Sequence, residues 1–112
     1  MHHPEDYVEA VLACVEQVPP GRVTTYGSIA EAVGRFGPRR VGNVMAEHGG
    51  PVPWWRVVRA DGTLPPSHQG EAVARYREEG TPTRSTGAGA LRVELASAYW
   101  RPPDCSGGHR IG

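Results

Sequence analysis

The sequence contains no lysine, so each of its 12 basic residues is an arginine. Cysteine is also scarce, because Cys14 and Cys105 are too few for a disulfide framework and lack the spacing of a metal site. No apolar run approaches the roughly 20 residues that a membrane-spanning helix requires. The first residues lack the basic and apolar stretches of a secretory signal. Together these absences predict a cytoplasmic protein that does not bind membranes.

The chain length and charge limit the fold and its partners. A chain of 112 residues can bury one modest core and is too short for two ordinary domains. The formal net charge of zero argues against a generally basic nucleic-acid surface. The charge is uneven, however: residues 1–20 contain four acids and no arginine, whereas residues 21–59 contain six arginines and two acids. The middle of the chain therefore has planar cations that can stack on rings and bases.

Hydrophobic periodicity predicts three helices in the first half of the chain. The first begins near residue 4 and ends before the Pro-Pro-Gly at 19–21. The second covers about 26–34 and the third about 38–48, joined by a glycine-containing turn. Gly34 is a typical helix C-terminus. The layout is that of a helix-turn-helix.

The second helix of this pair opens with Arg39 and Arg40. Side chains at the N-terminal end of a recognition helix are the ones that meet nucleic acid. The helix pair is also compatible with a winged-helix regulator that reads DNA sequence in the major groove. That regulator stays open as an alternative, because helix pairs of this kind occur in many helical cores.

The second half of the chain predicts short elements: a strand at 54–59, a returning strand at 63–64 that completes a wing-like hairpin, a helix at 71–79 and a strand at 91–95. The fourth helix has an Arg75–Glu79 pair at i,i+4 spacing. Residues 81–89 are typical of a flexible loop. The predicted fold is mainly α with a small β-hairpin, a winged helix-turn-helix domain over residues 1–101, followed by a disordered tail at 102–112.

Three motifs resemble the DNA-binding domain of O6-alkylguanine-DNA alkyltransferases. They are VPPGRVTTYGSIA at residues 18–30, RRVG at residues 39–42 and PWWRVV at residues 53–58. They occur in that family's order and at similar spacing, and the resemblance extends over about residues 5–80. It implies the winged helix-turn-helix fold of that domain.

The sequence departs from the enzymes where their chemistry occurs. Trp54 stands in the position of the nucleophilic cysteine, and Trp55 in that of the neighbouring histidine. An indole cannot replace a thiolate as the acceptor of an alkyl group. The chain therefore resembles the alkyltransferase-like proteins, which are non-enzymatic relatives with tryptophan at the cysteine position. Neither Cys14 nor Cys105 has the surroundings of the missing nucleophile, and no cofactor or metal is predicted.

The resemblance implies a function in DNA repair. Such a protein binds double-stranded DNA that contains O6-alkylguanine, flips the damaged base out and flags it for nucleotide excision repair proteins. Alkylation at O6 weakens base pairing, which makes extrusion of the damaged base less costly. A monomer associated with the nucleoid when bound to DNA is expected.

Four residues are predicted to contact DNA. By the motif, Arg39 fills the gap that the flipped base leaves in the stack. Tyr26 presses on the phosphate beside the target nucleotide, and Arg40 contacts phosphate. Thr25 contacts phosphate or simply caps the second helix.

The predicted base pocket is lined by Trp54, Val57 and Ser67. Trp55 is expected to point away from it, because neighbouring residues of a strand face opposite sides. Arg56 is expected to support the pocket loop through backbone carbonyls or Glu79.

Overall fold

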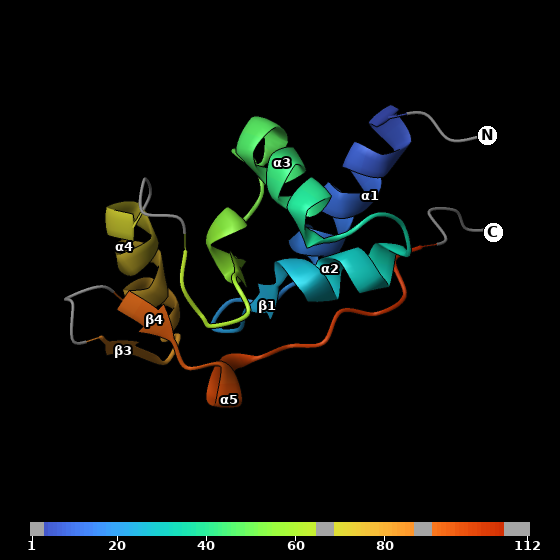
Figure 1. Cartoon of the computed structure of the whole chain (residues 1–112). Coiled ribbons are helices and arrows are strands. Elements are labelled where there is room, and N and C mark those ends of the chain that lie inside the picture. The colour runs from blue at the N-terminus through green and yellow to red at the C-terminus, as the bar shows by residue number, and fades with distance from the viewer. Residues whose placement is uncertain (1–3, 65–68, 87–90, 107–112) are drawn as a thin grey trace.

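The computed structural model describes residues 4–64, 69–86 and 91–106 of the chain (Figure 1). Its elements are, in order, α1 (Pro4–Glu16), β1 (Thr24–Thr25), α2 (Tyr26–Val33), α3 (Pro38–His48), the 3-10 helix η1 (Trp54–Arg56), β2 (Val57–Val58), α4 (Gln69–Glu79), β3 (Thr83–Ser85), β4 (Leu91–Val93) and α5 (Leu95–Ala98). The protein is mainly helical with small strands, as predicted. No helix within these ranges is long and apolar enough to cross a membrane.

The two helices of the helix-turn-helix begin and end where their sequence signals lie. Thr25 caps α2, because its side-chain oxygen accepts a hydrogen bond from the backbone N–H of Ser28 at 3.0 Å. Gly34 ends α2 in the left-handed conformation, with φ of 82°, which glycine adopts without steric cost. Pro38 occupies the first turn of α3, where its missing N–H has no partner to lose.

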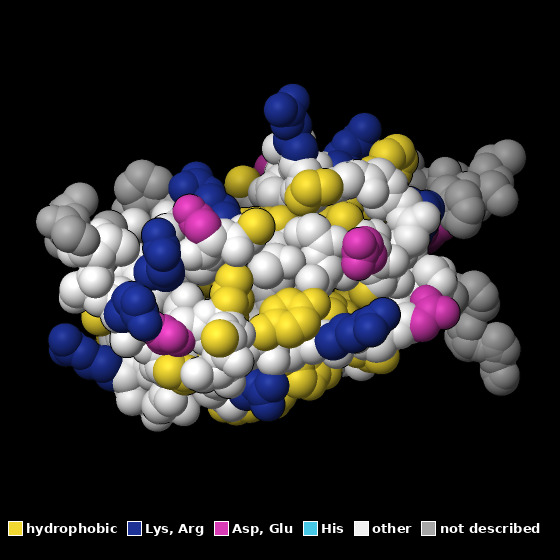
Figure 2. Space-filling view, turned by 60° about the horizontal axis from the view of Figure 1, so that its bottom comes forward, with side chains coloured by type: hydrophobic (Ala, Val, Ile, Leu, Met, Phe, Trp, Pro, Cys, Tyr) yellow, Lys and Arg dark blue, Asp and Glu magenta, His cyan; other side chains and the backbone are white. Residues whose placement is uncertain are grey.

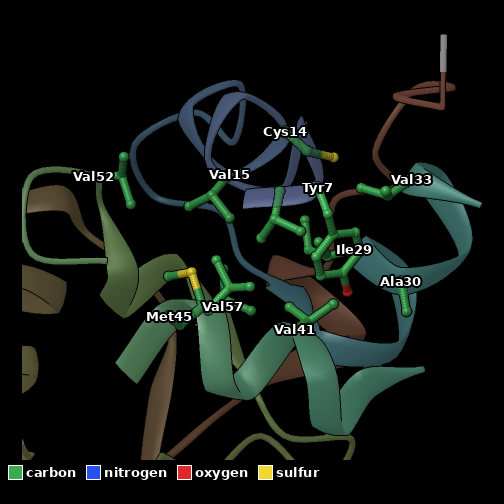
Figure 3. Packing of buried hydrophobic residues seen from close by; sticks show 12 residues of the cluster. Tyr7, Cys14, Val15, Ile29, Ala30, Val33, Val41, Met45, Val52 and Val57 are labelled. Carbon is green, nitrogen blue, oxygen red and sulfur yellow. The ribbon is translucent and has the colours of Figure 1, made fainter. Parts of the chain in front are cut away.

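The main core lies between α1, α2 and α3, whose apolar faces meet at one end of the molecule (Figures 1 and 3). Tyr7 and Val15 of α1 point toward Ile29 of α2 and Val41 of α3 (Figure 3). These side chains are almost fully buried. Val57 of β2 closes the same cluster and has no exposed surface. This core fixes α3, with its arginines, against the body of the protein.

The strand after η1 pairs differently from the prediction. β2 runs parallel to β1, with Thr24 opposite Val57 and Thr25 opposite Val58. Residues 54–56 form a 3-10 turn instead of a strand. Residues 63–64 form no ladder with β2. The turn is closed by two backbone hydrogen bonds, from Arg59 N to Thr63 O and from Gly62 N to Arg59 O, both at 2.8 Å. The wing-like hairpin was wrong because β2 takes its partner from a segment more than 30 residues earlier, which local patterns do not reveal.

A different hairpin is present nearer the C-terminus. β3 and β4 are antiparallel, with Arg84 opposite Arg92. Arg84 also forms an ion pair with Glu94. The prediction of a loop throughout 81–89 was therefore wrong for residues 83–85, whose Thr-Arg-Ser sequence has no apolar alternation. Val93 packs with Tyr76 and other apolar residues in a second core beside α4.

The segment that follows α5 returns to the helical end of the molecule. Trp100 N donates to Val23 O at 2.7 Å, and Cys105 N donates to Ala32 O at 2.8 Å. Cys105 forms a disulfide with Cys14 of α1, 91 residues earlier. The prediction of a disordered tail was wrong for residues 102–106, because a sequence rich in proline and polar residues gives no sign of these long-range bonds. Residues 107–112 lie outside the described residues.

Candidate nucleic-acid interface

The first turn of α3 presents the two arginines that sequence analysis assigned to DNA. Arg39 and Arg40 are both exposed. The Arg40 guanidinium lies over the ring of Phe36, with its central carbon 4.4 Å from the ring centroid. Phe36 belongs to the turn between α2 and α3, so the turn and the helix terminus form one surface. Their role in DNA binding stays a prediction.

The N-terminus of α2 holds the two other predicted DNA contacts. Thr25 performs the capping role that sequence analysis gave as its alternative, and its hydroxyl also contacts the Ser28 hydroxyl at 3.0 Å. Tyr26 is half-buried against the main core. Burial raises the pKa of Tyr26, although the nearby charge of Arg59 acts in the opposite direction. Its hydroxyl therefore keeps its proton at neutral pH and can donate a hydrogen bond to an anion.

Trp54 lies where the two cores meet. Its half-buried ring packs against both apolar clusters and contacts the Trp55 ring edge-to-face, with centroids 5.6 Å apart. Val57 does not line an open pocket as predicted, because it is fully buried in the main core. Ser67 lies outside the described residues. The base pocket around Trp54 stays a prediction.

A buried ion pair holds η1 in place. The Glu79 carboxylate accepts hydrogen bonds from Arg56 Nε at 3.1 Å and Nη2 at 2.5 Å, from Trp55 Nε1 at 3.0 Å and from Gly21 N at 3.2 Å. Arg56 also donates from Nη1 to Val18 O at 3.0 Å. The predicted support of Arg56 by a carbonyl and by Glu79 is therefore present. Together these bonds join α4, η1 and the loop before β1.

The charge of Glu79 follows from these contacts. Burial alone would raise the pKa of the Glu79 carboxyl. The hydrogen bonds from Arg56, Gly21 and Trp55, with the Arg56 charge, outweigh burial and hold that pKa below its ordinary value. The carboxylate therefore stays ionised at neutral pH.

The predicted Arg75–Glu79 pair does not form. The Arg75 guanidinium instead lies 3.8 Å from the Glu71 carboxylate and 3.9 Å from the Glu78 carboxylate. The reason is that Glu79 faces inward toward Arg56. The Arg75 guanidinium also lies 4.7 Å from the Trp55 ring centroid. Strand alternation, from which Trp55 was expected to point away from the pocket, does not apply, because residues 54–56 form a 3-10 turn.

Sequence analysis missed Phe36, which is 59% exposed and has a φ of 60°. The available signal was an aromatic residue directly before the Gly-Pro that opens α3.

Surface charges on the rest of the molecule are mixed. On the face in Figure 2, arginines alternate with acidic side chains around an apolar band. That face has no continuous basic surface, which agrees with the net charge of zero.

Comparison with known proteins identifies the class of this domain. A family model for the DNA-binding domain of 6-O-methylguanine DNA methyltransferase matches residues 6–80. The chain therefore belongs to this family, which confirms the resemblance predicted from the three motifs.

Particular relatives are named as an alkyltransferase-like protein and as DNA base-flipping proteins. The chain is 32% identical to Alkyltransferase-like protein 1 of Schizosaccharomyces pombe over 106 residues, which cover 88% of this chain and 97% of the relative. It is 32% identical to the DNA base-flipping protein of Vibrio parahaemolyticus over 105 residues, which cover 88% of this chain and 99% of that relative. The fold is similar to the crystal structure of S. pombe Atl1 in complex with damaged DNA containing O6-carboxymethylguanine. That similarity has a TM-score of 0.78 and 34% identity, and it covers 91% of this chain and 100% of Atl1.

Proposed function

We propose that this protein binds double-stranded DNA containing O6-alkylguanine, flips the damaged base out of the helix without dealkylating it, and flags it for nucleotide excision repair. The observation that supports the proposal is the similarity, over 91% of this chain, to Atl1 in complex with damaged DNA. The exposed arginines at the start of α3 are the matching feature of this chain.

The helix-turn-helix supplies the DNA contacts in this proposal. α3 enters the minor groove with its N-terminal turn foremost, so that the Arg39 guanidinium fills the space left by the flipped base. A planar guanidinium can stack on the neighbouring bases and hydrogen-bond the orphaned partner base. The Tyr26 hydroxyl donates to the phosphate beside the flipped nucleotide, since a tyrosine hydroxyl keeps its proton at neutral pH.

Recognition without dealkylation follows from the disulfide between the two cysteines and from the tryptophans of η1. Alkyl transfer needs an ionised thiol, and the two cysteines of the chain are joined to each other. Trp54 offers an apolar ring that can contact the extruded purine or its alkyl group. The Trp55 indole N–H donates to Glu79, and indole has no basic lone pair, so Trp55 cannot act as the proton acceptor of a nucleophile–base pair.

The test is a fluorescence titration with two duplexes that differ only in one O6-methylguanine. Wild-type protein should bind the damaged duplex more tightly. Arg39→Ala should weaken binding to it by about tenfold or more, since base stacking contributes roughly 1–3 kcal/mol per base. Arg77→Ala, which removes an exposed arginine from α4, is the matched control and should leave the affinity almost unchanged.

The outcomes separate the competing functions. Equal wild-type affinity for both duplexes would contradict lesion recognition and favour a sequence-reading regulator. Stoichiometric transfer of a radiolabelled methyl group to the protein would show an active alkyltransferase. The repair step is tested in an excision assay on a lesion-containing plasmid, where adding the protein should increase the incision rate only when excision proteins are present.

A further inference from the structure

Phe36 combines two unfavourable features at one position of the helix-turn-helix. Its ring is 59% exposed, and its backbone lies in the left-handed region with φ of 60°. Residues with a Cβ atom rarely adopt this conformation, and glycine is the residue that it favours. Strain of this kind persists where the surrounding structure fixes it, and it is common at binding sites. Burial does not explain the ring, because most of it faces solvent.

The contacts of the ring show what the strained turn achieves. On one side the Phe36 ring meets the Tyr7 ring of α1 edge-to-face, with centroids 5.0 Å apart and planes 88° apart. The Arg40 guanidinium lies over the ring at 4.4 Å. Phe36 is thus fixed by α1, and it supports an arginine of α3.

This support restricts the Arg40 side chain. An unsupported arginine on a helix surface samples many rotamers, and ordering it on binding costs entropy. A guanidinium held over a ring face does not use its N–H groups in that contact, so they stay available for an oxygen ligand. Phosphate oxygens suit such a planar set of donors.

We propose that Phe36 is a positioning residue that pre-orders Arg40 for contact with the DNA phosphate backbone. The inference rests on the proposed function, which supplies DNA as the ligand. It assigns Arg40 a task different from that of Arg39: Arg40 strengthens binding to any duplex, whereas Arg39 fills the gap that the flipped base leaves.

The test compares Phe36→Leu, Phe36→Tyr and Arg40→Ala in titrations of both duplexes at several salt concentrations. Leucine covers Tyr7 but has no π face for the guanidinium, whereas tyrosine retains that face. Phe36→Leu should weaken binding to both duplexes by about threefold, the size expected for an exposed cation–π contact. The preference for damaged DNA should stay unchanged.

Arg40→Ala should reduce the magnitude of the slope of log affinity against log salt by about 0.9, the value for one phosphate contact. Phe36→Tyr should bind like wild type.

A double variant shows whether the two residues act together. If Phe36 acts through Arg40, Phe36→Leu should weaken binding when Arg40 is present and have no effect in the Arg40→Ala background. Additive losses, or an unchanged affinity in Phe36→Leu with a native thermal melt, would overturn the inference while leaving lesion recognition intact. A wild type that binds both duplexes equally would contradict the proposed function, yet the undamaged duplex would still test Phe36.

A fourth variant, Phe36→Gly, separates positioning from folding. It relieves the left-handed strain, so it should weaken DNA binding without lowering the melting temperature.

Discussion

Replacement of Glu79 by alanine should destabilise the protein more than most surface substitutions. The Glu79 carboxylate accepts four hydrogen bonds, from two atoms of Arg56, from Trp55 and from Gly21. Its side chain is 11% exposed and that of Arg56 is 14% exposed. Alanine would therefore leave a largely buried guanidinium, an indole N–H and a backbone N–H without their acceptor.

The magnitude follows from the burial of this pair. Removing one partner of a buried ion pair costs about 3–5 kcal/mol. The remaining exposure of both side chains favours the lower end, so we expect a loss of about 3 kcal/mol in the free energy of unfolding. At about 4 °C per kcal/mol for a domain of this size, the melting temperature should fall by roughly 12 °C.

The assay is urea unfolding followed by circular dichroism, with a thermal melt as a second measurement. Glu78→Ala is the matched control, because Glu78 precedes Glu79 on α4 but has a 69% exposed side chain 3.9 Å from Arg75. Its loss should stay below about 0.5 kcal/mol, as for most exposed ion pairs. If Glu79→Ala lost less than about 1 kcal/mol, or no more than Glu78→Ala, the argument from the buried network would be refuted.

Acid should remove the same stabilisation. The folded pKa of Glu79 lies below its ordinary value of 4.5, so the carboxylate stabilises the fold fully above that pH. The contribution disappears as the pH falls through the folded pKa. The difference in unfolding free energy between wild type and Glu79→Ala should therefore be constant near neutral pH and shrink below pH 4.5. A difference that grew on acidification would contradict the assigned sign.

Three further predictions concern other parts of the molecule. Reduction of the Cys14–Cys105 disulfide should lower the unfolding free energy by about 2–4 kcal/mol, measured by urea unfolding with and without reductant, because the bond closes a 91-residue loop. Gly34→Ala should lower the unfolding free energy by about 1 kcal/mol, since the φ of Gly34 is 82° and the added Cβ would lie 3.2 Å from the Cβ of Ser106. Gly42→Ala is the control and should not destabilise the fold, because an added Cβ there meets open space. Trp54→Cys alone should accept almost no radiolabelled methyl group, because Trp55 provides no proton acceptor.

The N-terminal half of the fold could be predicted closely because its signals are local. Thr25 as a cap, Gly34 as a left-handed stop and Pro38 in a first turn each act within a few residues. The short strands could not be predicted in the same way. β2 pairs with β1 through a contact between distant segments, and β3 has no apolar alternation to mark it.

The candidate site was predicted in part. Arg39 and Arg40 are exposed at the start of α3, and Arg56 pairs with Glu79. Val57 was predicted to line the pocket, whereas it is fully buried in the main core. Phe36 was missed because its exposed ring and its left-handed backbone are properties of the folded chain, which no sequence motif marks.

By itself, the sequence determined the helix-turn-helix and the arginines at its tip, and it predicted an indole in the place of the enzymes' thiolate. These are local features, since capping, helical periodicity and the reactivity of a side chain depend on few neighbours. Only the tertiary structure decided that Glu79 turns inward to Arg56, that Cys105 returns to Cys14 and that Phe36 supports Arg40. The first two depend on where distant segments meet, which is fixed by burial of the whole core. The third depends on the left-handed backbone of Phe36 and on the contact of its ring with Tyr7 of α1.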